Sequence, residues 1–390
     1  MTEDSAVARQ YETHPYPAPV ADLAGRMLIG DPRCYSPLLW PEGRPREDLR
    51  ILVAGCGTSQ AAQLAFQNPG CEVTGIDISE ESLAHQRRWR EKHGLRNLHL
   101  AQTDLRDVRG EYELIVCTGV LHHLSDPDAG LRALGSVLAP RGAMHLMVYG
   151  YGPRAGIYML QDVFRRLGLG QDAHGIELVR SVLAGLPKYH YAHWWVSGAT
   201  ELVHDAALVD TFLHPQDRAY SVPEVLAFVE RCGLVFAGWE DNSTYYPDLW
   251  VKRESSLGKA LERLPERDQW AVIENLMLQI SQHCFFACRP ERGFVSVDFS
   301  GDGWLGYRPV LHPEASAEGK GDRAKIALRK LDVAVSGVDV FFLSQVDGKR
   351  TIRDMIAEPR LASVAEVSRI NHAHDFFSRM WRLGVLFLER

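Results

Sequence analysis

The chain has 390 residues, of which 46% are hydrophobic, and its 43 Lys and Arg are outnumbered by 50 Asp and Glu. This length and apolar content exceed what one hydrophobic core usually needs, so we expect about two domains. The acidic excess argues against a broad phosphate-binding surface, and nucleic acid is not an expected substrate.

Seven cysteines are scattered along the chain, mostly in apolar runs, which is typical of reduced intracellular thiols. The run from His283 to Cys288 superficially suggests a metal site, but strand alternation sends His283 to the opposite face from Cys284. We therefore expect no metal. No signal peptide and no apolar stretch of membrane-spanning length is recognised, so we expect no membrane partner and a cytoplasmic location. The sequence does not indicate the oligomeric state.

Short apolar runs alternate with amphipathic stretches from residue 49 to about residue 150, the pattern of a parallel sheet covered by helices. The expected strands are residues 50–54, 71–77, 98–101, 112–118 and 143–149. The expected helices are residues 59–67, 80–93 and 126–138, the second with Ser79 as its N-cap. The carboxyl ends of these strands should meet at one edge of the sheet.

The remainder of the chain has a different texture. Residues 151–215 form a helical, aromatic-rich insertion that we expect to cover a site. A helix at 222–232, strands at 234–239 and 282–289, and mostly helix over 253–280 should follow. A Gly-rich polar segment, 301–321, then separates a compact tail that reads helix, turn, helix, strand, with its turn at Asp347 and Gly348.

The sharpest motif is an apolar strand that enters a Gly55-x-Gly57 turn and then a helix. Glycine at these positions allows a tight turn and close approach of a ligand to the backbone. Asp77 ends the next strand, where its carboxylate can accept both hydroxyls of an adenosine ribose; alternatively, it only caps the helix near Ser79. Gln60 occupies the place where a dinucleotide fingerprint needs a small residue, which disfavours a nicotinamide enzyme.

These residues resemble the class I S-adenosylmethionine-dependent methyltransferase family, strand by strand over about residues 45–150. Gly55 and Gly57 resemble its first motif, Asp77 its ribose-binding acid, Asp104 and Leu105 its adenine-binding turn, and residues 118–124 its segment beside the methyl donor. The resemblance implies S-adenosyl-L-methionine as cofactor. The implied cofactor-binding residues are Ala54, Gly55, Cys56, Gly57, Gln60, Asp77, Ile78, Asp104, Leu105, Thr118 and Gly119.

Two positions depart from the family's first motif. The acid two residues before the first glycine is Val53 here, and the third glycine is Ser59. The missing carboxylate leaves open how the methionine ammonium is held. Backbone carbonyls near Gly55 and Thr118, or the Gln60 side chain, are the expected replacements.

Methyl transfer is an in-line displacement at an already activated sulfonium carbon, so alignment and exclusion of water matter more than any catalytic side chain. Where the acceptor must lose a proton, a histidine base suits neutral pH. The catalytic candidates are His122, beside the expected donor, and His190, His193 and His214 in the insertion. For each of the last three, a structural role is the better interpretation.

Aromatic and basic residues near the expected crevice are candidate acceptor contacts. They are Tyr11, Tyr16, Tyr149, Tyr151, Arg154, Tyr158 and Arg218. The segment from Asp210 to Tyr220 gathers a histidine, acids, an arginine and aromatics. A substrate-binding role and a solvated loop are equally good interpretations of it.

The resulting fold prediction is α/β: a Rossmann-like class I methyltransferase sheet with a helical aromatic-rich insertion and a small C-terminal α+β domain that resembles a winged helix. The expected domains are an N-terminal cap (1–44), the cofactor-binding core (45–150), the insertion (151–220), completion of the sheet (221–290) and the C-terminal domain (291–390). A small molecule is the expected acceptor. A peptide recruited by the C-terminal domain, a nicotinamide-dependent oxidoreductase and a binding protein without catalysis are the alternatives.

Overall fold

A computed structural model describes residues 3–18, 20–23, 31–43, 48–293, 296–329 and 331–390. The chain divides into two compact units. The first comprises Met1–Asp31, Arg46–Phe236 and Glu274–Arg292, and the second comprises Pro32–Pro45, Ala237–Ile273 and Gly293–Arg390. The domain boundaries drawn from the sequence stay a prediction.

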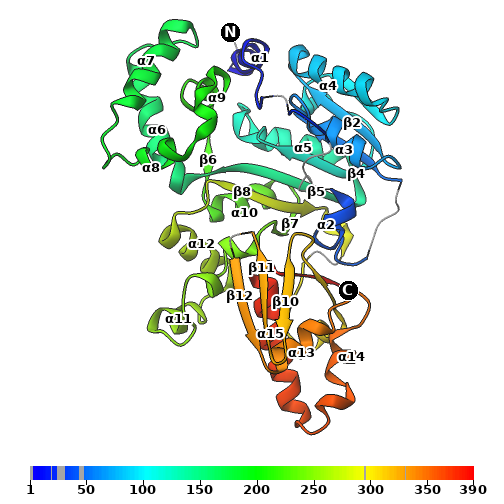
Figure 1. The fold of residues 1–390 in the computed structure, drawn as a ribbon. Coiled ribbons are helices and arrows are strands. Elements are labelled where there is room, and N and C mark those ends of the chain that lie inside the picture. The colour runs from blue at the N-terminus through cyan, green and yellow to red at the C-terminus, as the bar shows by residue number, and fades with distance from the viewer. Residues whose placement is uncertain (1–2, 19, 24–30, 44–47, 294–295, 330) are drawn as a thin grey trace. The chain divides into compact units, whose positions relative to one another are not determined.

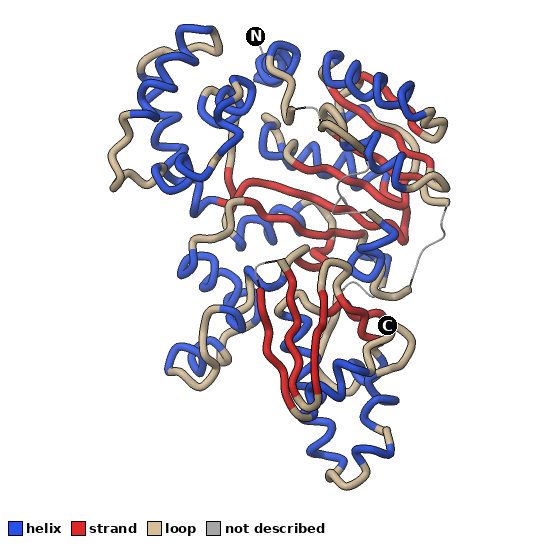
Figure 2. Tube along the Cα trace, viewed as in Figure 1, coloured by secondary structure: helices blue, strands red, loops and turns tan. Residues whose placement is uncertain are grey.

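An eight-stranded sheet organises the first unit, in the order β3-β2-β1-β4-β5-β8-β7 with β6 beside β5 (Figures 1 and 2). Strands β1 to β5 pair in parallel, whereas β8 runs antiparallel to β5. The bounds are β1 Arg50–Ala54, β2 Glu72–Asp77, β3 Leu98–Gln102, β4 Tyr112–Thr118, β5 Leu138–Gly150, β6 Ala219–Tyr220, β7 Val235–Trp239 and β8 Gln282–Cys288. The predicted α/β class and the five parallel strands are confirmed, although β5 begins earlier than expected.

Helices connect the parallel strands, as the alternating pattern predicted. They are α3 Gln60–Gln67, α4 Glu80–His93 and α5 Pro127–Val137. Ser79 caps α4 by accepting a hydrogen bond from the Ser82 N–H, and Asp126 caps α5 in the same way. The sheet order reverses direction between β1 and β4, and a ligand crevice is expected outside the carboxyl ends of the strands at such a switch point.

The insertion folds as helices with an apolar core of its own, as expected. Its helices are α6 Tyr151–Arg166, α7 Ala173–Ala184, α8 His193–Gly198 and α9 Asp205–Phe212. Their buried faces meet around Ile157, Phe164, Leu208 and Phe212. Helix α10 (Val222–Arg231) follows, and α1 (Glu3–Thr13) opens the chain.

The second unit is mixed α+β. Strand β9 (Arg308–Leu311) pairs antiparallel with β13 (Leu386–Glu389), and β10 Ser316–Lys320, β11 Arg323–Leu328 and β12 Leu331–Ser336 form an antiparallel meander. Its helices are α2 Pro32–Leu39, α11 Ser256–Leu261, α12 Glu266–Met277 (which ends in the first unit), α13 Val338–Ser344, α14 Ile352–Ile356 and α15 Glu366–Arg382.

The predicted order of helix, turn, helix and strand in the tail is confirmed by α13, α14, α15 and β13. The Gly-rich segment 301–321, which was expected to separate the tail from the rest of the chain, contains β9 and β10 and is part of the second unit. The likeness to a winged helix stays a prediction. None of the described helices is long and apolar enough to cross a membrane.

Candidate functional site

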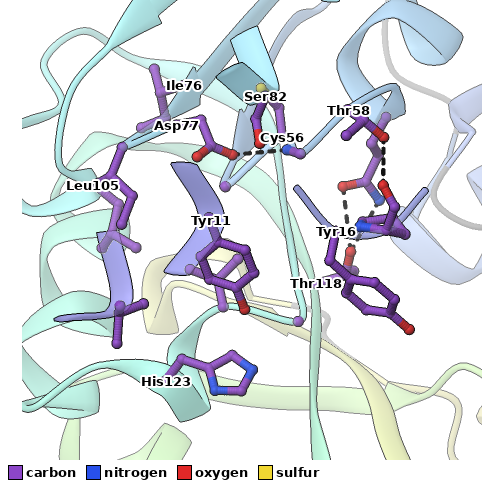
Figure 3. A pocket seen from close by; sticks show the side chains of 18 of the residues that line it. Tyr11, Tyr16, Cys56, Thr58, Ile76, Asp77, Ser82, Leu105, Thr118 and His123 are labelled. Atoms are coloured by element: carbon purple, nitrogen blue, oxygen red, sulfur yellow. Dashed lines mark hydrogen bonds between the residues drawn. The ribbon is translucent and has the colours of Figure 1, made fainter. Parts of the chain in front are cut away.

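A cavity of about 730 Å³ opens at the carboxyl ends of β1, β2 and β4 in the first unit (Figure 3). Its volume lies within the range of about 300–1,000 Å³ typical of small-molecule sites. All the cofactor residues expected from the sequence line it except Ala54, which is buried at the end of β1. The strand-end geometry therefore brings these residues together, although they come from four separate stretches of the chain.

The two motif glycines adopt the left-handed backbone conformation, with φ of +70° at Gly55 and +53° at Gly57. A Cβ atom on Gly55 would lie 2.3 Å from a methyl carbon of Val120. A Cβ on Gly57 would lie 3.4 Å from Cδ of Pro17. Glycine is thus required at position 55 for both backbone conformation and space.

Asp77 ties the ends of β1 and β2 together at the cavity wall. Its Oδ2 accepts a hydrogen bond of 2.9 Å from the Gly57 N–H, and its Oδ1 accepts one of 2.9 Å from the Ser79 N–H. Burial raises the pKa of Asp77, while the N–H bonds from Ser79 and Gly57 act in the opposite direction. Each carboxylate oxygen retains one further lone pair, so the side chain can still accept from ligand hydroxyls.

Gln60 and Thr118 face each other across the cavity near the start of α3. The Gln60 amide nitrogen donates to Thr118 Oγ1 over 3.0 Å. Val53, which replaces the family's acid, is fully buried in β1. The Gln60 amide and the Thr118 hydroxyl are therefore polar groups that could take the place of the missing acid.

Asp104 caps the short 3-10 helix Leu105–Asp107 and pairs with its neighbour Arg106. The Arg106 guanidinium lies 2.5 Å from Asp104 Oδ2, and this contact lowers the pKa of Asp104. Both residues and Leu105 line the cavity. The turn thus presents an apolar side chain and a hydrogen-bonded acid to the same space.

The end of α1 and the segment after it cover one side of the cavity. Thr58 donates its hydroxyl to the Pro17 carbonyl over 2.8 Å, and Ser79 donates to the Tyr11 carbonyl over 3.2 Å. The Glu12 carboxylate accepts from the backbone N–H groups of Glu80 and Glu81, over 2.5 and 3.3 Å. A carboxylate at the N-terminus of α4 satisfies free N–H groups and complements the helix dipole, so the end of α1 is anchored to the start of α4.

The far part of the cavity is aromatic and contains a buried carboxylate. In the view of Figure 3, His123 lies across from Asp77, with the Tyr11 ring between them. The Asp210 carboxylate accepts from the Tyr11 hydroxyl over 3.0 Å, from the Gln10 amide over 3.4 Å and from the Tyr149 hydroxyl over 3.5 Å. Burial raises the pKa of Asp210, which the Tyr11 hydrogen bond partly counters.

Known proteins match this chain over the same core. The family model for a methyltransferase domain matches residues 52–144. An uncharacterized protein (syc1184_c) of Synechococcus sp. is 34% identical over 261 residues, 63% of this chain and 61% of the relative. A ubiquinone biosynthesis O-methyltransferase of Bordetella avium is 26% identical over 131 residues, 32% of this chain and 54% of that protein. The chain thus spans less than two thirds of the length of either curated relative.

The fold likeness extends further than the sequence likeness. The structure of PKMT2 from Rickettsia typhi in complex with AdoHcy superposes with a TM-score of 0.64 at 12% identity, covering 96% of this chain and 77% of that one. The chain carries a class I S-adenosylmethionine-dependent methyltransferase domain. The resemblance inferred from the glycine turn, Asp77 and Asp104 is confirmed.

The histidine that lines the methyltransferase cavity is His123, which is not among the catalytic candidates predicted from the sequence. His123 lines the cavity, whereas His122 is fully buried and packs on the Tyr149 ring at a centroid distance of 3.9 Å. Burial, followed by the charge of His123, holds the pKa of His122 well below its usual range. His214 stacks on His123 with ring centroids 3.9 Å apart.

His190 and His193 are not brought to the methyltransferase cavity. His190 accepts a hydrogen bond of 3.0 Å from the Ala192 N–H within its own turn, and His193 begins α8. Neither is among the residues that line the cavity. Their expected catalytic role has no geometric support.

The predicted acceptor residues separate into two groups. Tyr11, Tyr16 and Tyr149 line the methyltransferase cavity. Tyr151 is 58% exposed and lines a second, smaller pocket. Arg218 lies over the Tyr220 ring, 4.8 Å from its centroid.

Arg154 and Tyr158 lie behind the cavity wall. The Arg154 guanidinium is 2.9 Å from Asp217 Oδ2 and 3.5 Å from the centroid of the Tyr149 ring. Tyr158 donates to the same Asp217 carboxylate over 3.5 Å. These residues buttress Tyr149 and do not contact the cavity themselves.

Proposed function

We propose that the chain is an S-adenosylmethionine-dependent methyltransferase that acts on a small-molecule acceptor. The observation that supports this most is the continuity of one cavity, from the Gly57 and Asp77 pair to the aromatic wall of Tyr11, Tyr16 and Tyr149. The first part has the donors and acceptors that suit an adenosine, and the second part has room and polarity for an acceptor.

In this proposal the ribose hydroxyls donate to Asp77, the adenine lies by the Asp104 and Leu105 turn, and the methionine end lies by Gln60 and Thr118. Cofactor contacts are also assigned to Cys56, Ile78 and Gly119, which line the same wall. Bound S-adenosylmethionine supplies an activated methyl group. The protein holds the acceptor in line with it and excludes water.

A small acceptor fits the enclosure of the far part of the cavity. Tyr11 and Tyr16 line it, and Asp210, which also lines it, is only 3% exposed. The ubiquinone biosynthesis O-methyltransferase similarity also supports a small acceptor. A nicotinamide cofactor is not favoured, because Gln60 stands where a pyrophosphate would approach the helix.

The test begins with isothermal titration of the full chain with S-adenosylmethionine and S-adenosylhomocysteine. Radiolabelled donor is then incubated with the protein and cell extract, which is separated into small-molecule and macromolecular fractions. We expect micromolar-range binding and label in the small-molecule fraction. Absence of binding to both compounds contradicts the proposal.

A peptide acceptor is the second candidate, and label in the macromolecular fraction would support it. Truncation of the tail is a poor test of this alternative. A cut near Pro309 would divide β9, which pairs with β13. It would also separate Trp304 from Phe377, which are buried in one apolar cluster of the second unit, and so would expose the core of that unit. Fractionation of the labelled product avoids this difficulty.

A further inference from the structure

Two stacked histidines, of which His123 lines the cavity, are held by the backbone of a single residue, Gln216. His123 Nδ1 lies 2.9 Å from the Gln216 carbonyl oxygen. His214 Nδ1 lies 3.0 Å from the Gln216 N–H, which donates to it. One residue therefore contacts both imidazoles through groups of opposite hydrogen-bonding character.

These contacts fix the two tautomers. A carbonyl oxygen can only accept, so His123 must carry its proton on Nδ1, which leaves a lone pair on Nε2. An N–H can only donate, so His214 Nδ1 must be unprotonated, and the neutral ring carries its proton on Nε2. Burial, followed by the charge of His123, holds the pKa of His214 well below its usual range and keeps that ring neutral.

The remaining contacts agree with this assignment. The Tyr11 hydroxyl lies 3.0 Å from Asp210 Oδ1 and 3.5 Å from His214 Nε2. Its single proton goes to the carboxylate, so its oxygen accepts from the His214 Nε2–H. The hydrogen-bonding groups of His214 Nε2 and the Tyr11 hydroxyl are thereby paired with each other and with Asp210. His123 Nε2 is left as the basic lone pair of the group.

A metal ion is the obvious alternative, since ligand atoms of His123, Asp210 and His214 lie within 4.8 Å of one another. Metal coordination by histidine needs a lone pair on each ring. His214 offers its only lone pair to the Gln216 N–H, and the two rings are stacked at 27°, so their in-plane lone pairs do not converge. The geometry favours a proton acceptor over a metal site.

We infer that His123 is the general base of the reaction and that the acceptor is a neutral phenolic hydroxyl. This inference rests on the proposed methyltransferase function. The acceptor oxygen attacks the methyl carbon, the carbon–sulfur bond breaks with its electron pair going to sulfur, and the hydroxyl proton passes to His123 Nε2. The products are the methyl ether, S-adenosylhomocysteine and an imidazolium, which later releases its proton to solvent.

The surroundings of His123 suit this proton transfer. A phenol, with a pKa near 10, is a much stronger acid than an aliphatic alcohol, so a histidine base takes its proton more readily. The Asp210 carboxylate can compensate the imidazolium, because ligand atoms of the two side chains lie within 4.8 Å of each other. The rings that contact His123 are those of His122, His214 and Tyr149. Three donors already occupy the Asp210 carboxylate, which disfavours an ammonium acceptor.

The tautomers are tested directly in the wild-type chain. Protein labelled with ¹⁵N-histidine is bound to S-adenosylhomocysteine, and two-bond ¹H–¹⁵N correlations are recorded above the pKa of histidine. His123→Gln and His214→Gln assign the two rings by loss of their resonances. We expect protonated Nδ1 and free Nε2 for His123, and the reverse for His214.

The reverse pattern, or a shift of both rings on addition of stoichiometric Zn²⁺, overturns the inference. Titration of the ligand-free labelled protein with S-adenosylhomocysteine separates the base assignment from the proposed methyltransferase function. Failure to bind it defeats the methyltransferase proposal, whereas binding with the wrong tautomers defeats only the base.

The acceptor class is tested with 4-nitrophenol as probe. Its absorbance should show the bound phenolate, below the pH at which the free phenol ionises, in the wild-type complex with S-adenosylhomocysteine. The phenolate band should be lost in His123→Gln and kept in the control His190→Gln, whose ring is outside the cavity. Binding as the neutral phenol, no binding, or an unchanged band in His123→Gln contradicts the inference.

Methyl transfer provides a further readout, with radiolabelled donor and the small-molecule fraction of the cell extract as the source of acceptor. His123→Gln should lower the rate by about 100- to 10,000-fold, the usual contribution of a general base, without weakening S-adenosylhomocysteine binding. An equal loss in His190→Gln, or retention of the rate in His123→Gln, contradicts the assignment.

Discussion

The backbone N–H of Gly57 donates to the carboxylate of Asp77 over 2.9 Å, across a separation of twenty residues in the chain. This bond joins the turn after β1 to the end of β2, and both residues line the same cavity. The glycine turn and the acid are therefore one structural unit. Cofactor affinity should depend on both its members.

Replacing Asp77 with Asn should weaken S-adenosylhomocysteine binding by about 10- to 100-fold. The physical reason is loss of one to two hydrogen bonds to a charged group, each contributing about 1.5 kcal/mol or more. Isothermal titration measures the change. Asp107→Asn is the matched control, because Asp107 is exposed and does not line the cavity, and an equal loss there would contradict the role of Asp77.

Cofactor affinity should fall at acidic pH, and the fall should begin above the pH at which an exposed Asp titrates. Burial, and to a lesser degree the nearby Glu12 charge, raise the pKa of Asp77 in the free protein. Ribose hydroxyls donate to the ionised carboxylate, so binding favours that form, and the Kd should rise as pH falls through the raised pKa.

The measurement is the Kd for S-adenosylhomocysteine as a function of pH, with circular dichroism to establish that the chain stays folded. Asp77→Asn removes the titrating group and should give a flat profile over the same interval. A wild-type profile that is equally flat contradicts the prediction.

Gly55→Ala should destabilise the first unit by about 1–3 kcal/mol, the usual range for overpacking. The new Cβ would meet Val120 at 2.3 Å while the backbone is held at a φ of +70°. Thermal unfolding followed by circular dichroism reports the change. Gly94→Ala separates the two causes, because Gly94 has a similar φ of +62° but nothing within 4 Å of its Cβ position. Equal losses in the two variants would show that the collision is unimportant.

Local signals explain why the core of the fold could be predicted. The apolar runs of β1, β2, β4 and β5 are largely buried, and Ser79 and Asp126 cap the helices that follow their strands. The glycine turn and Asp77 were recognisable because short-range backbone requirements fix residue type. The meander β10 to β12 had a signal too, since Ile326, Leu328, Val333 and Val335 alternate with exposed residues, but the glycines and charges around them obscured it.

The acceptor end of the site could not be predicted in the same way. His122 and His123 are consecutive, and only the path of the 3-10 turn Leu121–His123 decides which ring reaches the cavity. Asp210 lies in α9 and meets Tyr11 from 199 residues away in sequence. The sequence singled out the segment that begins at Asp210 but did not predict its burial, because the partners of this carboxylate come from other elements.

The Arg154 and Asp217 pair supports the acceptor wall, and breaking it should be costly. Their side chains are 6% and 1% exposed, and Asp217 also accepts from Gln161 over 3.0 Å. Arg154→Ala leaves that carboxylate buried without its charge partner, and loss of one member of a buried pair destabilises by about 3–5 kcal/mol. It also removes the guanidinium that packs on the Tyr149 ring at 3.5 Å.

Urea unfolding of Arg154→Ala should show this loss, and the double variant with Asp217→Asn should recover part of it, since the uncompensated charge is then gone. The exposed pair Arg166 and Asp162 is the control, and Arg166→Ala should change stability by about 0.5 kcal/mol or less. Similar losses from the buried and the exposed arginine, or no recovery in the double variant, would mean that Arg154 acts through packing on Tyr149 rather than through its charge.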